Sequence, residues 1–209
     1  MRPVCSALTG HGGTPLFEIL REDFRRYRHV WRSLGPRRSA LRACFSYGLI
    51  AVCLYRYGRW TRTLRPRWLS LPFKTVYVLL KIPLELLVGI DISGNADIGP
   101  GLYIGHFGGV FLHCNAGRNL SVGQGVTLGY KGAGRSDGWP RLGDNIYIGV
   151  GAKVIGNIGI GDGVVIGANT VVTKDIPAHM RVVGAAVRVM PISYSPVEAV
   201  ADPAVESDR

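Results

Sequence analysis

A repeat of six residues constrains the fold of the second half of the chain more than any other feature. From Ile92 onward an aliphatic residue or alanine stands at every sixth position, and the residue after it is usually glycine. After one interruption the rhythm resumes at Leu142. The repeat positions are Ile92, Ile98, Ile104, Val110, Ala116, Val122, Leu128, Leu142, Ile148, Val154, Ile160, Ile166 and Val172. Neither a helix nor a simple hairpin produces a period of six.

A parallel β-helix explains this period. Each hexad supplies a short strand and a tight corner, the aliphatic side chain points into a prism, and glycine tolerates the corner's backbone angles. Stacked coils bury their core only against neighbouring coils, so most repeat positions are expected to be scaffold. The interruption, GYKGAGRSDGWPR at 129–141, leaves this register. A loop in an otherwise regular solenoid is a favoured place for function.

The basic charge of the protein belongs wholly to its first 90 residues. The chain of 209 residues has a formal net charge of +11. Residues 1–90 hold 16 Lys and Arg against 4 Asp and Glu, whereas residues 91–209 hold 9 against 10. No RNA- or DNA-binding motif accompanies the basic residues, so nucleic acid is a disfavoured partner. A membrane surface or a protein partner is the better expectation.

Apolar residues in this basic part recur at helical spacings of three and four. The Gly35-Pro36 pair breaks the pattern, and two further apolar stretches follow at about 39–60 and 69–88. Neither has the long uncharged run of a membrane-spanning helix. We favour packed helices for both stretches. Peripheral contact with an anionic membrane stays open, because aromatic and basic residues alternate over 55–68.

These patterns divide the chain into four segments. They are a loose N-terminus at 1–15, a basic α-helical region at 16–88, a β-helix at 89–190 with its loop at 129–141, and a loose tail at 191–209. The four cysteines have no paired spacing, so we expect neither disulfides nor a metal site, and a reduced cytosolic setting. Residues 1–15 lack the apolar stretch of a signal peptide.

Three segments resemble the left-handed β-helix acyltransferases, the hexapeptide-repeat transferases, and in particular their serine acetyltransferase branch. The segments are GIDISGNADIGPGLYIGHFGG (89–109), QGVTLGYKGAG (124–134) and IGVGAKVIGNIGIGDGVVIGANTVVTKDIP (148–177). The YIGHFGG sequence and the Arg-rich N-terminal part look most like the members found in polysaccharide biosynthesis clusters. The resemblance implies a left-handed parallel β-helix, acetyl-CoA as co-substrate, and a homotrimer or dimer of trimers with active sites between neighbouring prisms.

The resemblance makes His106 the candidate catalytic residue. O-acetyl transfer needs a base for the hydroxyl proton, and histidine, with a pKa of about 6.5, suits this task at neutral pH. The acceptor would then attack the thioester directly, with no Ser or Cys nucleophile. His113 is the rival base, but we favour a surface or subunit-interface role for it. Cys114 beside it is interpreted as a packing residue.

Two departures from the family pattern bear on the acceptor. Gly105 stands where the family has an aspartate that orients the catalytic imidazole. Gly138 and Trp139 replace an Arg-His pair that binds the amino acid's carboxylate in the family. This loss argues against free serine, and a tryptophan favours stacking on a sugar ring. Lys131 and Arg135 in the same loop are candidates to hold an acidic group, so serine stays open.

The remaining candidates come from position-by-position matches to the family. Asp91 matches an aspartate near the acceptor, and we leave open whether it binds the acceptor, orients His106 or caps a turn. Backbone N–H groups of Gly129 and Tyr130 are candidate oxyanion donors. Small residues at the corners would line the pantetheine arm of CoA, and basic residues would bind the phosphates of CoA. A solvated surface role for Lys153 stays equally open. These donor-site candidates are Ala152, Lys153, Ala168, Thr173, Lys174 and Arg188.

Three functions follow from this sequence. We favour an acetyl-CoA-dependent O-acetyltransferase acting on a glycan or polysaccharide-precursor hydroxyl. The first alternative is a serine O-acetyltransferase. The second is a catalytically inactive β-helix that serves as a scaffold or binding trimer, suggested by Gly105. Retention of His106 together with the Thr173-Lys174 pair argues against the inactive scaffold.

Overall fold

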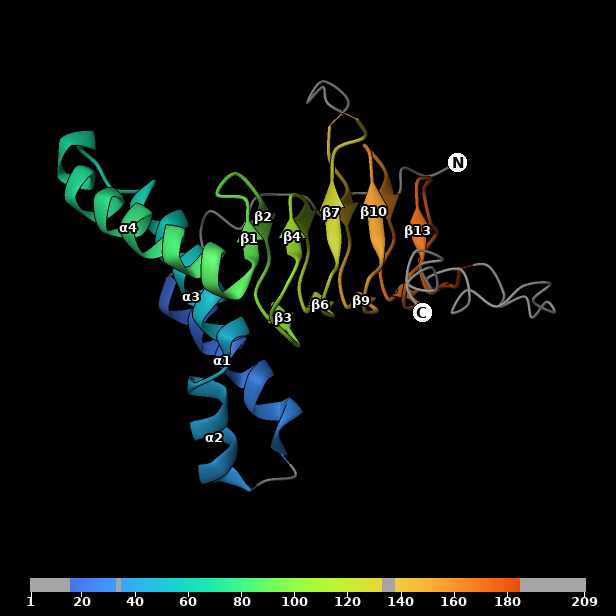
Figure 1. Ribbon diagram of the computed structural model, residues 1–209, viewed down its shortest axis with the longest axis horizontal. Helices are drawn as coiled ribbons and strands as arrows, with labels where there is room; N and C mark the ends of the chain where they lie inside the picture. The colour runs from blue at the N-terminus through green and yellow to red at the C-terminus, as the bar shows by residue number, and fades with distance from the viewer. Residues whose placement is uncertain (1–15, 33–34, 133–137, 185–209) are drawn as a thin grey trace, which may run out of the picture.

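The computed structural model describes residues 16–32, 35–132 and 138–184. Within these ranges an N-terminal group of helices leads into a stack of short parallel strands (Figure 1). The helices are α1 (Leu16–Val30), α2 (Pro36–Cys44), α3 (Tyr47–Thr61) and α4 (Leu71–Val88), with a 3-10 helix, η2 (Arg67–Ser70), before α4. The segments expected to be loose, 1–15 and 191–209, lie outside the described residues.

The strands form three parallel sheets, because each strand pairs with its counterpart one coil later. Sheet A has the order β1-β4-β7-β10-β13, sheet B has β11-β8-β5-β2, and sheet C has β14-β12-β9-β6-β3. Sheet A contains β1 (Ile90–Ile92), β4 (Val110–Leu112), β7 (Thr127–Gly129), β10 (Lys153–Ile155) and β13 (Val171–Val172). Sheet B contains β2 (Asp97–Ile98), β5 (Asn115–Ala116), β8 (Arg141–Leu142) and β11 (Gly159–Ile160). Sheet C contains β3 (Tyr103–Ile104), β6 (Ser121–Val122), β9 (Tyr147–Ile148), β12 (Val165–Ile166) and β14 (Arg181–Val182).

The prism interior consists of the residues that the hexad rhythm predicts. Every repeat position from Ile92 to Val172 is buried. The register stacks Leu112 on Leu128 and Leu128 on Val154, so neighbouring coils fill the interior with ladders of aliphatic side chains. The predicted parallel β-helix preceded by helices is therefore confirmed. Cys114 also points inward and is fully buried, and this burial raises the pKa of its thiol to about 12.

Helix α3 packs against the first coil of the β-helix. Val52 and Tyr55 belong to the same buried cluster as the prism aliphatics. The Tyr55 hydroxyl donates to Ala96 O at 2.8 Å and accepts from Ile98 N at 3.2 Å, which anchors α3 to β2. Tyr55 and Arg56 are both buried, so this part of the aromatic and basic stretch faces protein, and packed helices are the correct interpretation for α3.

A buried ion pair fastens α1 and α3 to the β-helix. Arg56 Nε donates to Asp23 Oδ2 at 2.9 Å, and its other nitrogens donate to the backbone oxygens of Ile98 and Gly99. Asp23 Oδ1 accepts the backbone N–H groups of Gly101 at 2.7 Å and Leu102 at 2.9 Å. The pair satisfies backbone groups at a coil corner that would otherwise be buried without partners.

Candidate active site

His106 lies where a coil corner of the β-helix meets the helical region. It lies two residues after the end of β3 and is exposed. A pocket of about 320 Å³ opens beside it, lined by Trp31 just after α1, by the junction of α2 and α3, and by the corner itself. The lining residues are Trp31, Arg42, Phe45, Ser46, Tyr47, Gly48, Gly105, His106 and Phe107. The imidazole is thus accessible to a small substrate.

The helical region fixes this corner from two sides. The buried Tyr27 hydroxyl of α1 accepts from Ile104 N at 2.9 Å and donates to Ile104 O at 3.3 Å, two residues before His106. Gly48 of α3 packs so closely on Ile104 O that a Cβ atom there would overlap it. Beyond the histidine, Phe107 meets Tyr47 edge-to-face, with 5.1 Å between ring centroids. The position of His106 therefore depends on how α1 and α3 dock.

Gly105 leaves room for a Cβ atom, the first side-chain atom of the aspartate that the family resemblance implies at this position. A Cβ atom built on Gly105 would lie 3.5 Å from Tyr103 Cε1 and 3.7 Å from Val122 O, which is ordinary van der Waals contact. Its φ lies outside the left-handed region, so a side chain adds no backbone strain. Neither backbone strain nor a clash at Cβ therefore requires glycine at position 105.

Asp91 is half-buried on β1 and forms a polar cluster with a different histidine. Its Oδ2 lies 3.1 Å from His113 Nε2, and its Oδ1 accepts from Lys81 Nζ at 3.3 Å. Lys81 also pairs with Glu85 at 2.7 Å, one turn further along α4. These contacts join Asp91 to His113 and Lys81, and the three roles left open for Asp91 stay predictions.

The charge of this cluster is unevenly distributed. Partial burial acts to raise the pKa of Asp91, but hydrogen bonds with His113 and Glu85 and the charge of Lys81 outweigh it, so this pKa is lowered. Burial and the neighbouring Asp91 raise the pKa of Glu85, against the effect of Lys81. Asp91 is therefore the more acidic of the two carboxyl groups, and it is the one that contacts His113.

Aromatic rings from the interrupting loop extend the cluster around His113. Tyr130 lies edge-on to the His113 ring at 6.3 Å, and Trp139 lies 5.7 Å from Tyr130 with a tilted orientation. Both loop residues are half-buried. Gly129 ends β7 and is buried, and Lys131 is exposed. Arg135 lies outside the described residues.

His113 has contacts that the linear sequence does not reveal. We interpreted it as a surface or interface histidine, and in the structure it joins a carboxylate to the aromatic rings of the loop. The proximity of His113 to Asp91 could be found only from the register in which the coils pair. Because Ile92 pairs with Leu112, the residues that flank this pair, Asp91 and His113, come within reach of each other.

The donor-site candidates are dispersed over the later coils. Lys153 Nζ donates to Gly125 O at 2.5 Å and to Thr127 Oγ1 at 3.0 Å, so its ammonium group is already engaged by the sheet A face. The Ala152 N–H donates to Gly149 O at 3.2 Å, so it is not free for a pantetheine arm. The corner residues Ala168, Thr173 and Lys174 are exposed. Arg188 lies outside the described residues.

The candidates fall on two opposite edges of sheet A. His106 precedes β4, whereas His113 follows it, and the loop carrying Tyr130 and Trp139 leaves the end of the adjacent strand β7. Figure 1 shows the loop at one edge of sheet A and the strands of sheet C near the other edge. Within the described part of one chain, the imidazole of His106 and the aromatic cluster of His113 are therefore separate sites.

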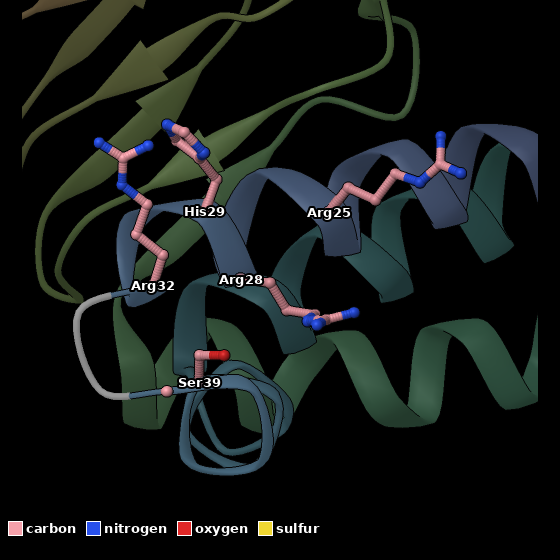
Figure 2. A pocket seen from close by; sticks show the side chains of 6 residues that line it. Arg25, Arg28, His29, Arg32 and Ser39 are labelled. Atoms are coloured by element: carbon pink, nitrogen blue, oxygen red, sulfur yellow. The ribbon is translucent and has the colours of Figure 1, made fainter.

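A second pocket, of about 360 Å³, lies on the helical region and is strongly basic. It is lined by Arg25, Arg28 and His29 of α1, by Arg32 just after this helix, and by Gly35 and Ser39. Figure 2 shows these side chains pointing in different directions, with Arg32 and His29 on one side and Arg25 and Arg28 away from them. The pocket is a basic surface whose side chains do not converge on one point.

The hexad-built prism, with its pocket at a coil corner, defines the chain as a hexapeptide-repeat β-helix protein. No family model matches it. The serine acetyltransferase of Staphylococcus aureus strain N315 is 47% identical over 102 residues, which are 48% of this chain and 48% of that protein. The serine acetyltransferase of Synechococcus elongatus is 35% identical over 191 residues, covering 86% of this chain and 74% of that protein.

The solved structures that resemble this chain are also serine acetyltransferases. The Neisseria gonorrhoeae serine acetyltransferase in complex with serine superposes with a TM-score of 0.65 at 28% identity, covering 83% of this chain and 68% of that one. The Brucella abortus serine acetyltransferase in complex with coenzyme A gives 0.65 at 27% identity, covering 82% and 66%. The chain belongs to the serine acetyltransferase family. It spans about half the length of the S. aureus relatives that it matches.

Proposed function

We propose that this protein is an acetyl-CoA-dependent O-acetyltransferase with His106 as its general base. The observation that carries the proposal is the position of His106, exposed in a pocket at a coil corner within the segment that resembles the family's catalytic sequence. The structure of the related Brucella abortus serine acetyltransferase is that of a complex with coenzyme A. This supports acetyl-CoA as the co-substrate. The proposal implies a cytosolic setting, where acetyl-CoA is available.

The chemistry requires one base and one oxyanion site. His106 accepts the proton of the acceptor hydroxyl as its oxygen attacks the thioester carbonyl carbon. Backbone N–H groups of Gly129 and Tyr130 stabilise the negative oxygen of the tetrahedral intermediate. Collapse of this intermediate breaks the C–S bond, and the imidazolium of His106 returns the proton to the leaving thiolate. The products are the O-acetyl ester and free CoA.

This mechanism needs a neighbouring subunit. The oxyanion candidates and His106 lie on opposite edges of sheet A in one chain, so one chain alone cannot bring them to the same carbonyl group. A homotrimer with active sites between prisms would join the His106 edge of one subunit to the loop edge of the next. We therefore include a homotrimer, alone or as a dimer of trimers, in the proposal.

The comparisons favour L-serine as the acceptor over the glycan that the sequence favoured. The named relatives are serine acetyltransferases, and one related structure is a complex with serine. A glycan hydroxyl remains the second candidate because of one observation, the aromatic pair of Tyr130 and Trp139. Trp139 stands in place of a carboxylate-binding residue of the family and offers a ring face for a sugar. The narrower relation to polysaccharide-cluster members rests on the YIGHFGG sequence and the Arg-rich N-terminal part.

The test is release of free CoA by purified full-length protein. Acetyl-CoA is offered with L-serine in one reaction and with a soluble bacterial polysaccharide in another. His106→Ala should lower the rate by about 10²- to 10⁴-fold, whereas His29→Ala, a matched exposed histidine on α1, should leave it unchanged. If His113 is the base instead, His113→Ala should lower the rate and His106→Ala should not. No CoA release with either acceptor and no binding of CoA would establish the inactive scaffold instead.

A further inference from the structure

Helix α4 exposes mainly apolar residues, whereas its charged residues are half-buried. Its three charged residues, Lys74, Lys81 and Glu85, are half-buried on the side that faces the rest of the protein. Twelve residues of α4 are exposed, and Thr75 is the only polar one among them. The exposed apolar residues are Leu71, Pro72, Phe73, Val76, Val78, Leu79, Leu80, Ile82, Pro83, Leu86 and Leu87. A helix on a water-facing surface shows the opposite arrangement.

The packed side of α4 is well defined, so the inversion is not a consequence of loose docking. Tyr77 lies against Gly58 of α3 so closely that a Cβ atom on Gly58 would overlap its ring. Phe73, which is 37% exposed at the margin between the packed and the exposed side, meets Trp60 edge-to-face at 5.5 Å. Lys81 ties α4 to β1 through Asp91. Figure 1 shows α3 along one side of α4 and the other side uncovered.

The exposed side is long and strongly apolar. Leu79 is 65% exposed, Leu86 80% and Leu87 82%. Eighteen residues of α-helix extend over about 27 Å. The hydroxyl of Thr75 donates to Leu71 O at 3.1 Å, so this one polar group is satisfied within the helix. A continuous apolar surface of this size marks an interaction site.

The start of α4 carries the residues that favour a lipid interface. Trp68, in η2, is 69% exposed, and the exposed Arg62 and Arg65 precede it. Tryptophan is favoured at the headgroup level of a bilayer, and arginine pairs with anionic headgroups. No acidic residue lies on the exposed side of α4, and residues 1–90 hold 16 Lys and Arg against 4 Asp and Glu.

We propose that the exposed apolar face of α4, with Trp68, Arg62 and Arg65, docks on the surface of an anionic lipid bilayer. Among the described helices none is long and apolar enough to cross a membrane, so α4 lies in the interface rather than spanning it. The charge complementarity favours a lipid surface over a second copy of this chain, whose own helical region is equally basic. The proposal is independent of the acetyl-transfer chemistry.

The experiment uses full-length protein and sedimentation with vesicles. Vesicles of phosphatidylglycerol and phosphatidylcholine are compared with phosphatidylcholine alone, at low and high salt. The test variant is Leu79→Gln/Leu86→Gln/Leu87→Gln. The control variant, Phe17→Gln/Leu41→Gln/Val171→Gln, removes the same number of exposed apolar side chains elsewhere, since Phe17 is 79%, Leu41 62% and Val171 66% exposed.

The wild type and the control should sediment with the anionic vesicles, and the α4 variant should bind at least about tenfold more weakly. High salt should weaken binding without abolishing it, because the apolar contribution is not screened. Quenching of tryptophan fluorescence by brominated lipids should fall in Trp68→Phe. Absence of binding by the wild type, or equal binding by both triple variants, would overturn the proposal. Loss of oligomer mass in the α4 variant without any vesicle binding would assign the face to a second copy.

Discussion

Replacing Asp23 by alanine should separate the helical region from the β-helix. Asp23 is fully buried, and the Arg56 side chain that it pairs with is only 5% exposed. The substitution removes the partner of a buried guanidinium and also removes the acceptor of the Gly101 and Leu102 N–H groups. Arg56 keeps only its hydrogen bonds to the backbone oxygens of Ile98 and Gly99.

The expected loss is large because two separate penalties apply. Breaking a buried ion pair from one side costs about 3–5 kcal/mol. Each backbone donor left buried without an acceptor adds about 1–3 kcal/mol, although effects within one network are not additive. We expect Asp23→Ala to lower the free energy of unfolding by about 4–6 kcal/mol. Net stabilities are only about 5–15 kcal/mol, so the variant should be close to unfolding.

The assay is urea unfolding followed by circular dichroism, with Glu22→Ala as the control. Glu22 is the neighbouring residue on α1 and pairs with Arg118 at 2.6 Å, but both side chains are more than a third exposed. This surface pair should contribute only about 0–1 kcal/mol. CoA release should also fall in Asp23→Ala, because α1 and α3 position the corner that carries His106. If the two variants differ by less than about 1 kcal/mol, the buried pair does not hold these parts together.

Three further outcomes follow from particular contacts. Gly48→Ala should lower the free energy of unfolding by about 1–3 kcal/mol or more in urea titrations, because its Cβ would overlap a backbone oxygen, whereas Gly129→Ala meets nothing within 4 Å and should not. The pKa of Asp91 is lowered in the fold, so its stabilisation is complete above about pH 4 and is lost as the pH falls through the folded value. The stability advantage of the wild type over Asp91→Asn should accordingly be constant from pH 8 to pH 5 and shrink below about pH 4. Cys114, with its pKa raised to about 12 by burial, should react with a thiol reagent at pH 8 only after unfolding, whereas the exposed Cys44 should react in the native protein, and equal rates would contradict this.

The comparison of expectation and structure is clearest at the repeat positions. Ile104, Leu128 and Val154 were assigned to the prism interior from their spacing alone, and all three are fully buried. A period of six specifies an inward position once per strand, whatever the rest of the chain does. The site could not be derived in the same way. Asp91 and His113 are 22 residues apart, and only the pairing of β1 with β4 brings them to 3.1 Å.

The amino-acid sequence by itself determined the β-helix, its interrupting loop and the division between a basic helical part and a neutral repeat part. These properties are local or periodic, so they can be read along the chain. Only the tertiary structure decided that Arg56 is buried on Asp23, that Lys153 is engaged by sheet A and that α4 turns its charged residues inward. Each of these depends on which distant surface packs against the residue. Helical periodicity marks an apolar face but does not reveal whether protein or another phase covers it.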